Sequence, residues 1–315
     1  MKIGHFSGNG IGFVGAVFGE RVFNLSEAAL RIGNLVLTDF TSLFRQERFD
    51  VTLFAELYGR ERDRKECWHD MKNLSFLPLL RPGKIICLGL NYVEHAREGK
   101  VPIPEEPIYF EKAVTSIIAH DQPVIYPPHL GRIDPEVELA FVIGKRARAV
   151  REAEARAFIA GYTILNDMTA RDLQQKDIGN RHPWFRSKSL DTFCPIGPWV
   201  VTADEINPQE ALTIRLRVNG EMRQNSSTRY LVFNVPTLLC RISELITLDP
   251  GDIISTGTPE GIAPIYPGDV MEAEIEKIGI LRNPVNPVRN SSRCNSKPNG
   301  ALNPALPTGR QSELF

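Results

Sequence analysis

Short strand-like segments separated by proline- and glycine-rich turns fill residues 84–285. Asn219-Gly220 marks one of these turns as a hairpin. Strands and helices do not alternate regularly, which argues against a doubly wound sheet or a TIM barrel. We therefore predict a strand-dominated α+β domain. The predicted strands cover residues 84–90, 137–144, 162–166, 212–218, 252–255 and 270–276, and the predicted helices cover residues 151–159 and 236–246.

The first 80 residues have the pattern of a small separate domain. Strand-like runs at residues 11–18 and 21–25 precede helical patterns at residues 27–30 and 53–57, with Ser26 as the expected N-cap. Prolines and a glycine interrupt both periodicities at residues 77–83, which is typical of a linker. We predict a small N-terminal domain at 1–80 and a larger domain at 81–285.

The segment 286–315 is rich in Asn, Pro, Ser and Arg, and Glu313 is its only acidic residue. It contains too little apolar surface to offset an ordering entropy of roughly 1 to 2 kcal/mol per residue. We predict a disordered tail without a role in the fold or the chemistry. Contact of its cationic residues with RNA or a membrane is the alternative.

The overall charge excludes a general affinity for polyanions. The chain has 315 residues, with 37 Lys and Arg against 38 Asp and Glu, and a formal net charge of -1. No basic field therefore exists to attract nucleic acid or a membrane surface. Glycines interrupt the N-terminal segment before it forms the apolar core of a signal peptide, and no apolar run is long enough to cross a bilayer. We expect a cytoplasmic protein.

Two glutamates fall on one face of the predicted strand at residues 137–144. Side chains alternate along a strand, so Glu136 and Glu138 share one face while apolar residues occupy the other. Neighbouring like charges repel, and a hard cation relieves the repulsion where the site is partly buried. A solvent-facing charged strand edge is the alternative.

A third acid, Asp167, ends the next predicted strand. The following segment 169–172 resembles a capping box that starts a helix, on which Arg171 and Gln174 face the same way and can grip an anionic substrate. Ligation by carboxylate oxygens alone favours Mg²⁺ or Mn²⁺ over Zn²⁺.

Three further features are weaker when taken singly. His95 and Glu98 lie one helical turn apart, which suits a general base oriented by a carboxylate but also a surface ion pair. Lys188 lies in a polar loop, where a lysine is ordinarily solvated. The hydroxyl-lined turn 255–261 either cradles a carboxylate or is only a tight turn.

Taken together, six motifs over residues 84–285 resemble the fumarylacetoacetate hydrolase family. They are Leu88-Gly89-Leu90-Asn91-Tyr92 with His95 and Glu98, Pro107 to Lys112, Glu136-Val137-Glu138-Leu139, Asn166-Asp167 with Thr169 to Asp172, Lys188 with Asp191, and Thr256-Gly257-Thr258-Pro259. Residues 1–80 are similar in character to the small N-terminal domain of many bacterial members.

The resemblance implies a mixed β-sandwich roll, a homodimer, and a divalent metal held by Glu136, Glu138 and Asp167. It also implies that His95 and Glu98 form the base dyad on a lid-like segment. The residues expected to contact the carboxylate or oxyanion of the substrate are Arg171, Gln174, Lys188 and Thr258, and Lys188 is also counted among the catalytic residues.

We therefore predict a Mg²⁺-dependent hydrolase, with Mn²⁺ or Ca²⁺ as alternative ions, that cleaves a carbon–carbon bond in acylpyruvate or fumarylpyruvate-type β-diketo acids. The metal would act as a Lewis acid on small dicarboxylic or 2-oxo acids. An isomerase or decarboxylase of 2-hydroxyhepta-2,4-diene-1,7-dioate-type or oxaloacetate-type acids in aromatic compound catabolism is the alternative. A catalytically silent binding protein on the same fold is a further one.

Overall fold

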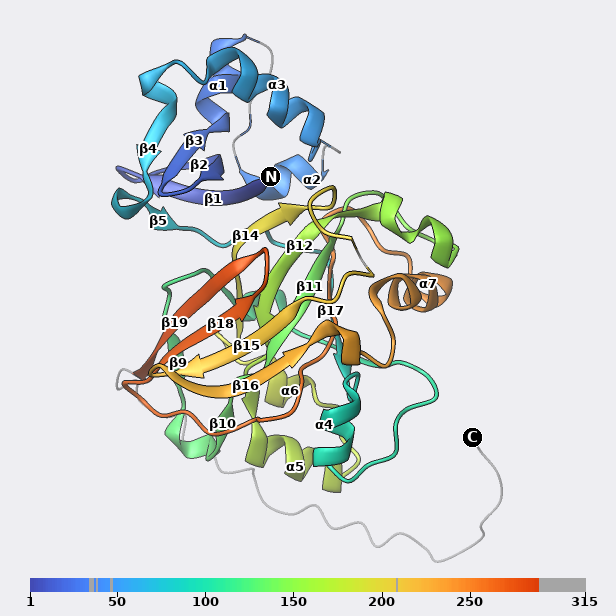
Figure 1. Ribbon diagram of the computed structural model, residues 1–315. Helices are drawn as coiled ribbons and strands as arrows, with labels where there is room; N and C mark the ends of the chain where they lie inside the picture. The colour runs from blue at the N-terminus through green and yellow to red at the C-terminus, as the bar shows by residue number, and fades with distance from the viewer. Residues whose placement is uncertain (34–36, 38, 46–47, 208, 289–315) are drawn as a thin grey trace, which may run out of the picture.

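A large sheet runs through the molecule (Figure 1). This computed structural model describes residues 1–33, 37, 39–45, 48–207 and 209–288. The strands of the large sheet are β1 Lys2–Gly8, β2 Ile11–Phe18, β3 Arg21–Asn24, β4 Trp68–Asp70, β5 Ser75–Phe76, β6 Ile85–Gly89, β7 Ile108–Glu111, β8 Ile117–Ile118, β11 Val137–Ile143, β12 Ile159–Asn166, β14 Cys194–Thr202 and β17 Ile253–Ser255. The main path runs β4-β3-β2-β1-β14-β12-β11-β17-β6-β7, with β5 paired to β1 and β8 paired to β14.

A second sheet has the order β16-β15-β18-β19-β9. Its strands are β9 Val124–Tyr126, β15 Thr213–Val218, β16 Glu221–Ser227, β18 Val270–Ile275 and β19 Gly279–Pro287. The predicted hairpin is confirmed between β15 and β16, where Asn219 and Gly220 both adopt left-handed φ angles of 53° and 79°. A short pair, β10 Ile133–Asp134 with β13 Thr169–Ala170, lies beside the site described below.

The two sheets pack face to face, and β11 contributes to the core on both of its faces. Leu139 and Phe141 join Leu216 of β15 and Leu281 of β19 in one buried cluster. The alternate residues Ala140 and Val142 belong to a second cluster, which extends to the N-terminal helices. The predicted alternation along this strand is therefore confirmed. The alternative of a solvent-facing edge is wrong, because every residue of β11 is buried.

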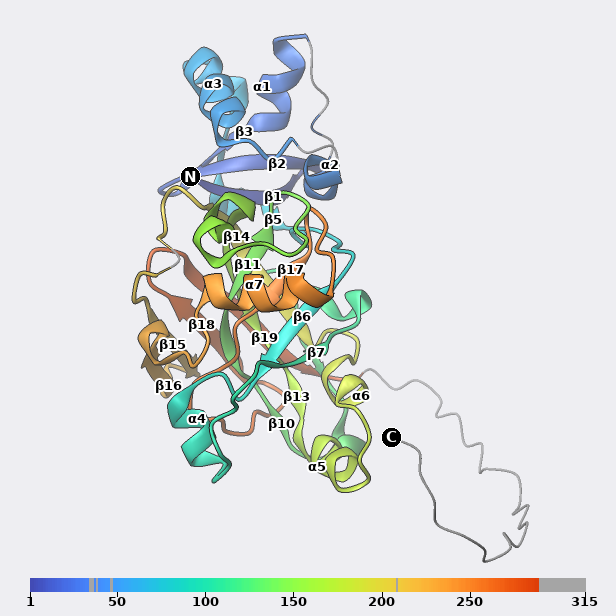
Figure 2. The same ribbon diagram turned by 90° about the vertical axis from the view of Figure 1, so that its right-hand side faces the viewer.

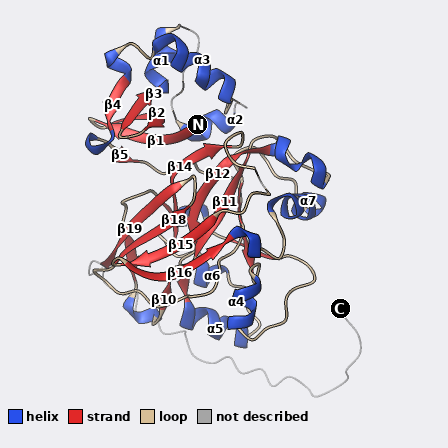
Figure 3. Cartoon of the chain, viewed as in Figure 1, coloured by secondary structure: helices blue, strands red, loops and turns tan. Residues whose placement is uncertain are grey.

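Helices lie around the sheets, as Figure 3 shows. The α-helices are α1 Leu25–Arg31, α2 Phe40–Arg45, α3 Val51–Glu61, α4 Val93–Glu98, α5 Arg171–Gly179, α6 Phe185–Lys188 and α7 Val235–Leu245, and the 3-10 segments are η1 Lys65–Cys67, η2 Met71–Asn73, η3 Val114–Ser116, η4 Pro128–Leu130, η5 Glu152–Phe158 and η6 Thr228–Tyr230. In both ribbon views α4, α5 and α6 gather at the end of the molecule opposite α1 and α3 (Figure 2). The expected strand-dominated α+β fold is confirmed.

The N-terminal region extends the large sheet, because Lys2 and Ile3 of β1 pair with β14. Residues 77–83 contain neither helix nor strand. The domain boundary near residue 80 stays a prediction. Of the predicted tail, Asn286 and Pro287 belong to β19, and residues 289–315 lie outside the described residues. No helix in the described ranges has the length and apolarity needed to span a membrane, and the cytoplasmic location stays a prediction.

Three local expectations were wrong. The N-cap of α1 is Asn24, whose Oδ1 accepts from the Glu27 amide at 2.9 Å, because the Ser26 hydroxyl accepts from Val14 N and donates to Leu37 O instead. The helix expected at residues 151–159 is the 3-10 segment η5. Within it only Ala155 is buried, so it lacks the apolar stripe of a packed α-helix.

The capping box expected at residues 169–172 does not form. Thr169 lies in β13, and its hydroxyl donates to the carbonyl of Asp167 at 3.1 Å. Asp172 Oδ2 accepts from the Arg132 amide at 3.1 Å rather than returning to the helix start. Long-range pairing of β13 with β10 therefore takes the place of the predicted local cap.

Candidate active site

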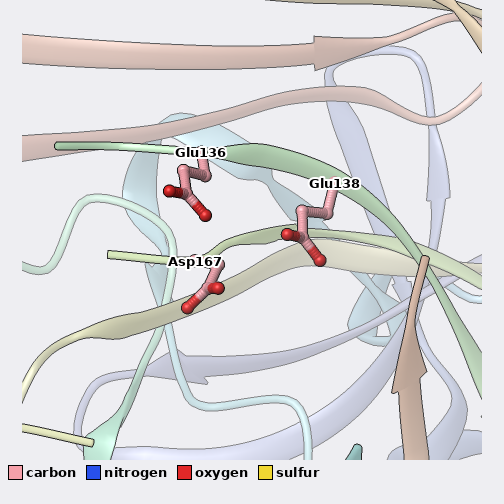
Figure 4. A group of neighbouring side chains, drawn as sticks. All are labelled: Glu136, Glu138 and Asp167. Atoms are coloured by element: carbon pink, nitrogen blue, oxygen red, sulfur yellow. The ribbon is translucent and has the colours of Figure 1, made fainter. Parts of the chain in front are cut away.

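Three buried carboxylates converge where β11 begins and β12 ends (Figure 4). The two strands are antiparallel, with Val137 opposite Asn166, so Glu136 stands across from Asp167. Glu138 follows two residues along β11 and returns to the same face. Each carboxylate offers one oxygen within 4.8 Å of the others, and all three residues are at most 4% exposed.

Two buried amides fix the start of β11. Asn166 Oδ1 accepts from the Glu136 amide at 2.9 Å, and Gln224 Oε1 accepts from the Val137 amide at 3.0 Å. Gln224 comes from β16 of the second sheet, and its amide nitrogen donates to Thr258 Oγ1 at 2.9 Å. The second sheet therefore helps to hold the carboxylates in place.

Two lysines neutralise part of this charge. Lys188 Nζ donates to Glu136 Oε2 at 2.8 Å and also to Asp167 Oδ2, so it bridges two of the three acids. Lys112 Nζ lies 2.6 Å from Asp167 Oδ1 and is fully buried. Burial alone would lower the pKa of Lys188, but Asp167 and Glu136 raise it above its usual range and keep the side chain charged.

Arg171 connects the carboxylates to helix α5. Its guanidinium donates to Asp134 Oδ2 at 2.8 Å, to Gln174 Oε1 at 2.6 Å and to Glu136. Burial opposes the charged form, but Glu136 and Asp134 raise the pKa of Arg171 further above its usual value. The predicted shared face of Arg171 and Gln174 is confirmed.

Glu136 and Glu138 have opposite electrostatic environments although they share a strand face. Burial raises the pKa of Glu136, but Lys188 and Arg171 outweigh this and hold it well below its usual range. Burial, and then the negative charge of Asp167, raise the pKa of Glu138 well above its usual value. Glu138 accepts from Ser255 Oγ at 2.5 Å and from the Gly257 amide at 3.1 Å. Within the described chain no Lys, Arg or His nitrogen pairs with Glu138.

This donor set fits a hard divalent cation. The three ligating atoms would all be carboxylate oxygens, and the buried charge of Glu138 has no cationic partner among the described residues. Lys188 bridges Glu136 and Asp167, so a cation held by all three acids must displace at least one contact of that lysine. Mg²⁺ and Mn²⁺ match the oxygen ligands, whereas Zn²⁺ would prefer nitrogen or sulfur.

The carboxylates border a cavity of about 550 Å³. The predicted site residues that line it are His95, Glu136, Glu138, Arg171, Gln174, Lys188 and Thr258. Its apolar wall includes Leu90, Val101, Phe110 and Trp184. The structure thus brings seven of the nine predicted residues to one cavity surface, although they are spread over residues 95–258 of the sequence.

The remaining two predicted residues each contact a residue that lines the cavity. Asp167 is 1% exposed and touches Lys188, which lines the cavity. Glu98 Oε2 lies 3.2 Å from His95 Nδ1 on helix α4, and Glu98 Oε1 accepts from the Gly261 amide at 3.2 Å. The expected one-turn spacing of the dyad is confirmed, and its glutamate is fixed by a second loop.

Thr258 is placed at the cavity but differs from the expected substrate donor. Its hydroxyl donates to the Val137 carbonyl at 3.0 Å and accepts from Gln224. The single hydroxyl hydrogen is therefore already used within the protein. In this arrangement Thr258 positions the start of β11 and offers a substrate no hydrogen.

Sequence reasoning missed four residues that hold the site. Lys112 lies in a family motif without an expected role, and Asp134, which accepts from Arg171, is not among the predicted site residues. Asn91 is buried and donates to Thr256 O at 2.8 Å, so it ties the segment before α4 to the turn after β17. Gln224 lies in an ordinary polar strand, and nothing in its local sequence indicates that it is buried.

Known proteins resemble this chain in both sequence and fold. The sequence profile described as Fumarylacetoacetate (FAA) hydrolase C-terminal matches residues 84–286. The chain is 44% identical over 221 residues to the mitochondrial oxaloacetate tautomerase fahd2 of Xenopus laevis, which is 68% of this chain and 69% of that protein.

Two solved structures extend the similarity to the whole fold. The 2-hydroxyhepta-2,4-diene-1,7-dioate isomerase from Mycobacterium marinum is 30% identical with a TM-score of 0.69, covering 91% of this chain and 98% of the other. The maleylpyruvate hydrolase from Sphingobium sp. SYK-6, in complex with manganese (II) ion and pyruvate, is 29% identical with a TM-score of 0.74, covering 92% and 100%. The names of these relatives describe three reactions on small organic acids.

Proposed function

This chain belongs to the fumarylacetoacetate hydrolase family, and on that premise we propose that it is a metal-dependent enzyme that cleaves a carbon–carbon bond in acylpyruvate or fumarylpyruvate-type β-diketo acids. The observation that carries the proposal is the convergence of Glu136, Glu138 and Asp167 beside a cavity that also contains His95. Metal ligands and a general base then act on the same bound molecule.

The inner end of the cavity suits a 2-oxo acid. Lys188 and Arg171 supply positive charge at the cavity surface, where a substrate carboxylate is stabilised in a partly dry environment. Glu136, Glu138 and Asp167 would hold the divalent cation, which supplies Lewis-acid stabilisation of negative charge on the oxygens of the substrate. The pyruvate and manganese ion in the Sphingobium relative support this assignment.

The His95 and Glu98 dyad supports hydrolysis. His95 lines the cavity, and Glu98 orients its ring through Nδ1. With Nδ1 as the donor, Nε2 is free to accept a proton from the water that attacks the distal carbonyl carbon. The bond between that carbon and the neighbouring methylene then breaks, giving a carboxylic acid and pyruvate after the methylene carbon receives a proton.

Tautomerisation or isomerisation of a 2-oxo acid is the second candidate, and the 44% identity to an oxaloacetate tautomerase favours it. This reaction needs the same anion binding and a proton transfer at the carbon next to the keto group, but no attacking water. Decarboxylation of the same class of acid uses the same binding groups.

The homodimer implied by the family remains part of the proposal, and light scattering tests it.

The decisive experiment is a panel of acylpyruvates, fumarylpyruvate, oxaloacetate and 2-hydroxy-dienedioates. Each is assayed with Mg²⁺, with Mn²⁺ and with EDTA. We expect turnover of at least one β-diketo acid that EDTA abolishes and added metal restores. Turnover of oxaloacetate tautomers alone would replace hydrolase by tautomerase. Inactivity on every compound would favour a binding protein.

A further inference from the structure

Two side chains that line the cavity, the Arg181 guanidinium and the His182 imidazole, are not used by the proposed chemistry. Arg181 and His182 line the cavity together with Ile178, beyond the C-terminal end of helix α5. Arg181 is exposed and forms no ion pair within 4 Å among the described residues. The acidic residues on the described cavity lining are Glu136 and Glu138, and both are buried. Arg181 therefore offers a positive charge to a ligand, beside the His182 ring, whose Nδ1 lies 3.8 Å from Asp177 Oδ1.

A rigid turn presents these side chains. Arg181 has a left-handed φ of 58°, and its amide donates to Ile178 O at 3.0 Å, while the His182 amide donates to Asp177 O at 2.8 Å. Asp177 is fully buried and accepts two hydrogen bonds from Arg186 Nε, at 2.9 and 3.0 Å. A turn fixed in this way holds the backbone of Arg181 at the cavity before a ligand arrives, which reduces the entropy lost on binding.

Helix α5 separates the two arginines, because it begins at Arg171 and ends two residues before Arg181. The rest of the cavity is mostly apolar. Val101, Phe110 and Trp184 line it, and its volume of about 550 Å³ is more than a four-carbon acid needs. A hydrocarbon chain bound here would bring a second anionic group toward Arg181. Two cationic ends separated by an apolar wall therefore match a molecule with a carboxylate at each end.

We propose that Arg181, assisted by His182, binds a second carboxylate at the outer end of the substrate and so selects extended dianionic 2-oxo acids over monoanionic ones. This inference rests on the proposed function, because that function places the inner carboxylate near Lys188 and Arg171. Arg181 is a specificity residue in this assignment, remote from the reacting carbons. The cation is at the solvent boundary, so the gain is that of a partly screened pair.

The test is a binding measurement that needs no turnover. Calorimetry on the Mg²⁺-loaded full-length protein compares 2-oxoadipate, a dianion, with 2-oxoheptanoate, a monoanion of similar length. We expect the wild-type protein to prefer 2-oxoadipate and R181Q to bind it about fivefold more weakly, with unchanged affinity for 2-oxoheptanoate. R181K should keep most of the preference, and H182Q should lose a smaller part of it. Raising the ionic strength should reduce the wild-type preference.

The matched control is K176Q, which removes one exposed positive charge from the same helix outside the cavity lining. It should change neither affinity. An R181Q protein with wild-type affinity for 2-oxoadipate, or with equal losses for both probes, would overturn the role of Arg181 alone. Binding without turnover of any panel substrate would count against the proposed reaction alone. A wild-type protein that binds neither probe would overturn both.

Discussion

Lys112 Nζ lies 2.6 Å from Asp167 Oδ1, and neither side chain is more than 1% exposed. Lys112 also donates to the backbone carbonyl of Lys188 and thus connects the residue after β12 to the end of helix α6. Removing one partner of a buried pair leaves an uncompensated charge. We infer that Lys112 stabilises the site from behind, whereas Lys188 faces the ligand.

Replacing Lys112 by Met should therefore lower the free energy of unfolding by about 3 to 5 kcal/mol, measured by denaturant titration. K188M is the matched comparison. K188M should destabilise the protein less, because Asp167 still pairs with Lys112 and Glu136 still pairs with Arg171. It should lower the activity more than K112M does. The reverse order of stabilities would contradict this division of roles.

Glu138 and Glu136 should respond oppositely to the same isosteric change. In metal-free protein, E138Q should raise the free energy of unfolding by about 1 to 3 kcal/mol, because folding raises the pKa of the buried Glu138 carboxyl and so costs free energy at neutral pH, whereas glutamine does not titrate. E136Q should lower it, because Lys188 and Arg171 each lose one of their two carboxylate partners.

The E138Q substitution that should stabilise the metal-free protein should weaken the binding of the metal ion. Loss of one of three carboxylate ligands in E138Q should weaken Mg²⁺ or Mn²⁺ binding by more than about a hundredfold in calorimetry. Unchanged metal affinity would remove Glu138 from the ligand set. A gain of stability together with a loss of metal affinity would show that the carboxylate is retained for the ion.

The carboxylate pattern is an example of what the local sequence could predict. The alternation along β11, the one-turn spacing of His95 and Glu98, and the neighbouring positions of Arg171 and Gln174 all follow from strand and helix periodicity. Each relationship connects residues close in the chain, where backbone geometry alone sets the separation.

The supporting contacts could not be predicted in this way. Lys112 is 55 residues from Asp167, and Gln224 is 87 residues from Val137. Pairing of β13 with β10 replaced the expected helix cap at Thr169, and Val137 O took the hydroxyl hydrogen of Thr258. These outcomes depend on how sheets and loops meet in three dimensions, which no local periodicity records.

The conservative substitution R171K should act strongly despite keeping the charge. The planar guanidinium of Arg171 contacts Asp134, Glu136 and Gln174 at once, and an ammonium group cannot reproduce this fork. Losing a charge-assisted bond of about 1.5 to 3 kcal/mol should lower kcat/KM on the best panel substrate roughly 10- to 100-fold. R217K, which alters an arginine paired with Glu274 outside the cavity lining, should retain activity. Full activity of R171K would exclude a role in anion binding.

His120 lies outside the active site, and its surroundings predict that the stability of the protein depends on pH. Its Nδ1 accepts from the Arg282 amide at 3.1 Å, and its ring packs on Phe76. Burial lowers the pKa of His120 below its usual value, although Asp121 opposes this shift and Arg282 adds to it. The neutral form is therefore the one favoured by folding.

The stabilisation from neutral His120 should be complete above the unfolded pKa of about 6.5 and be lost as the pH falls through the lower folded value. The slope is at most that of one proton, about 1.4 kcal/mol per pH unit. Denaturant titrations of wild-type and H120Q proteins between about pH 7.5 and pH 5 isolate this contribution, since the glutamine oxygen still accepts from Arg282. Parallel pH curves for the two proteins would show that His120 is not its source.

The dyad of His95 and Glu98 distinguishes hydrolysis from tautomerisation. If His95 takes the proton of the attacking water, H95Q should reduce hydrolysis by about 10²- to 10⁴-fold, while proton exchange at the methylene carbon should fall less because it requires no water attack. Both are followed on one acylpyruvate, by release of product acid and by solvent deuterium incorporation. E98Q, which weakens only the orientation of the ring, should give a smaller loss of hydrolysis. R97Q changes an exposed neighbour on the same helix outside the cavity lining and serves as the control. Equal losses of both reactions in H95Q would mean that His95 serves proton transfer at carbon, and the tautomerase candidate would then lead.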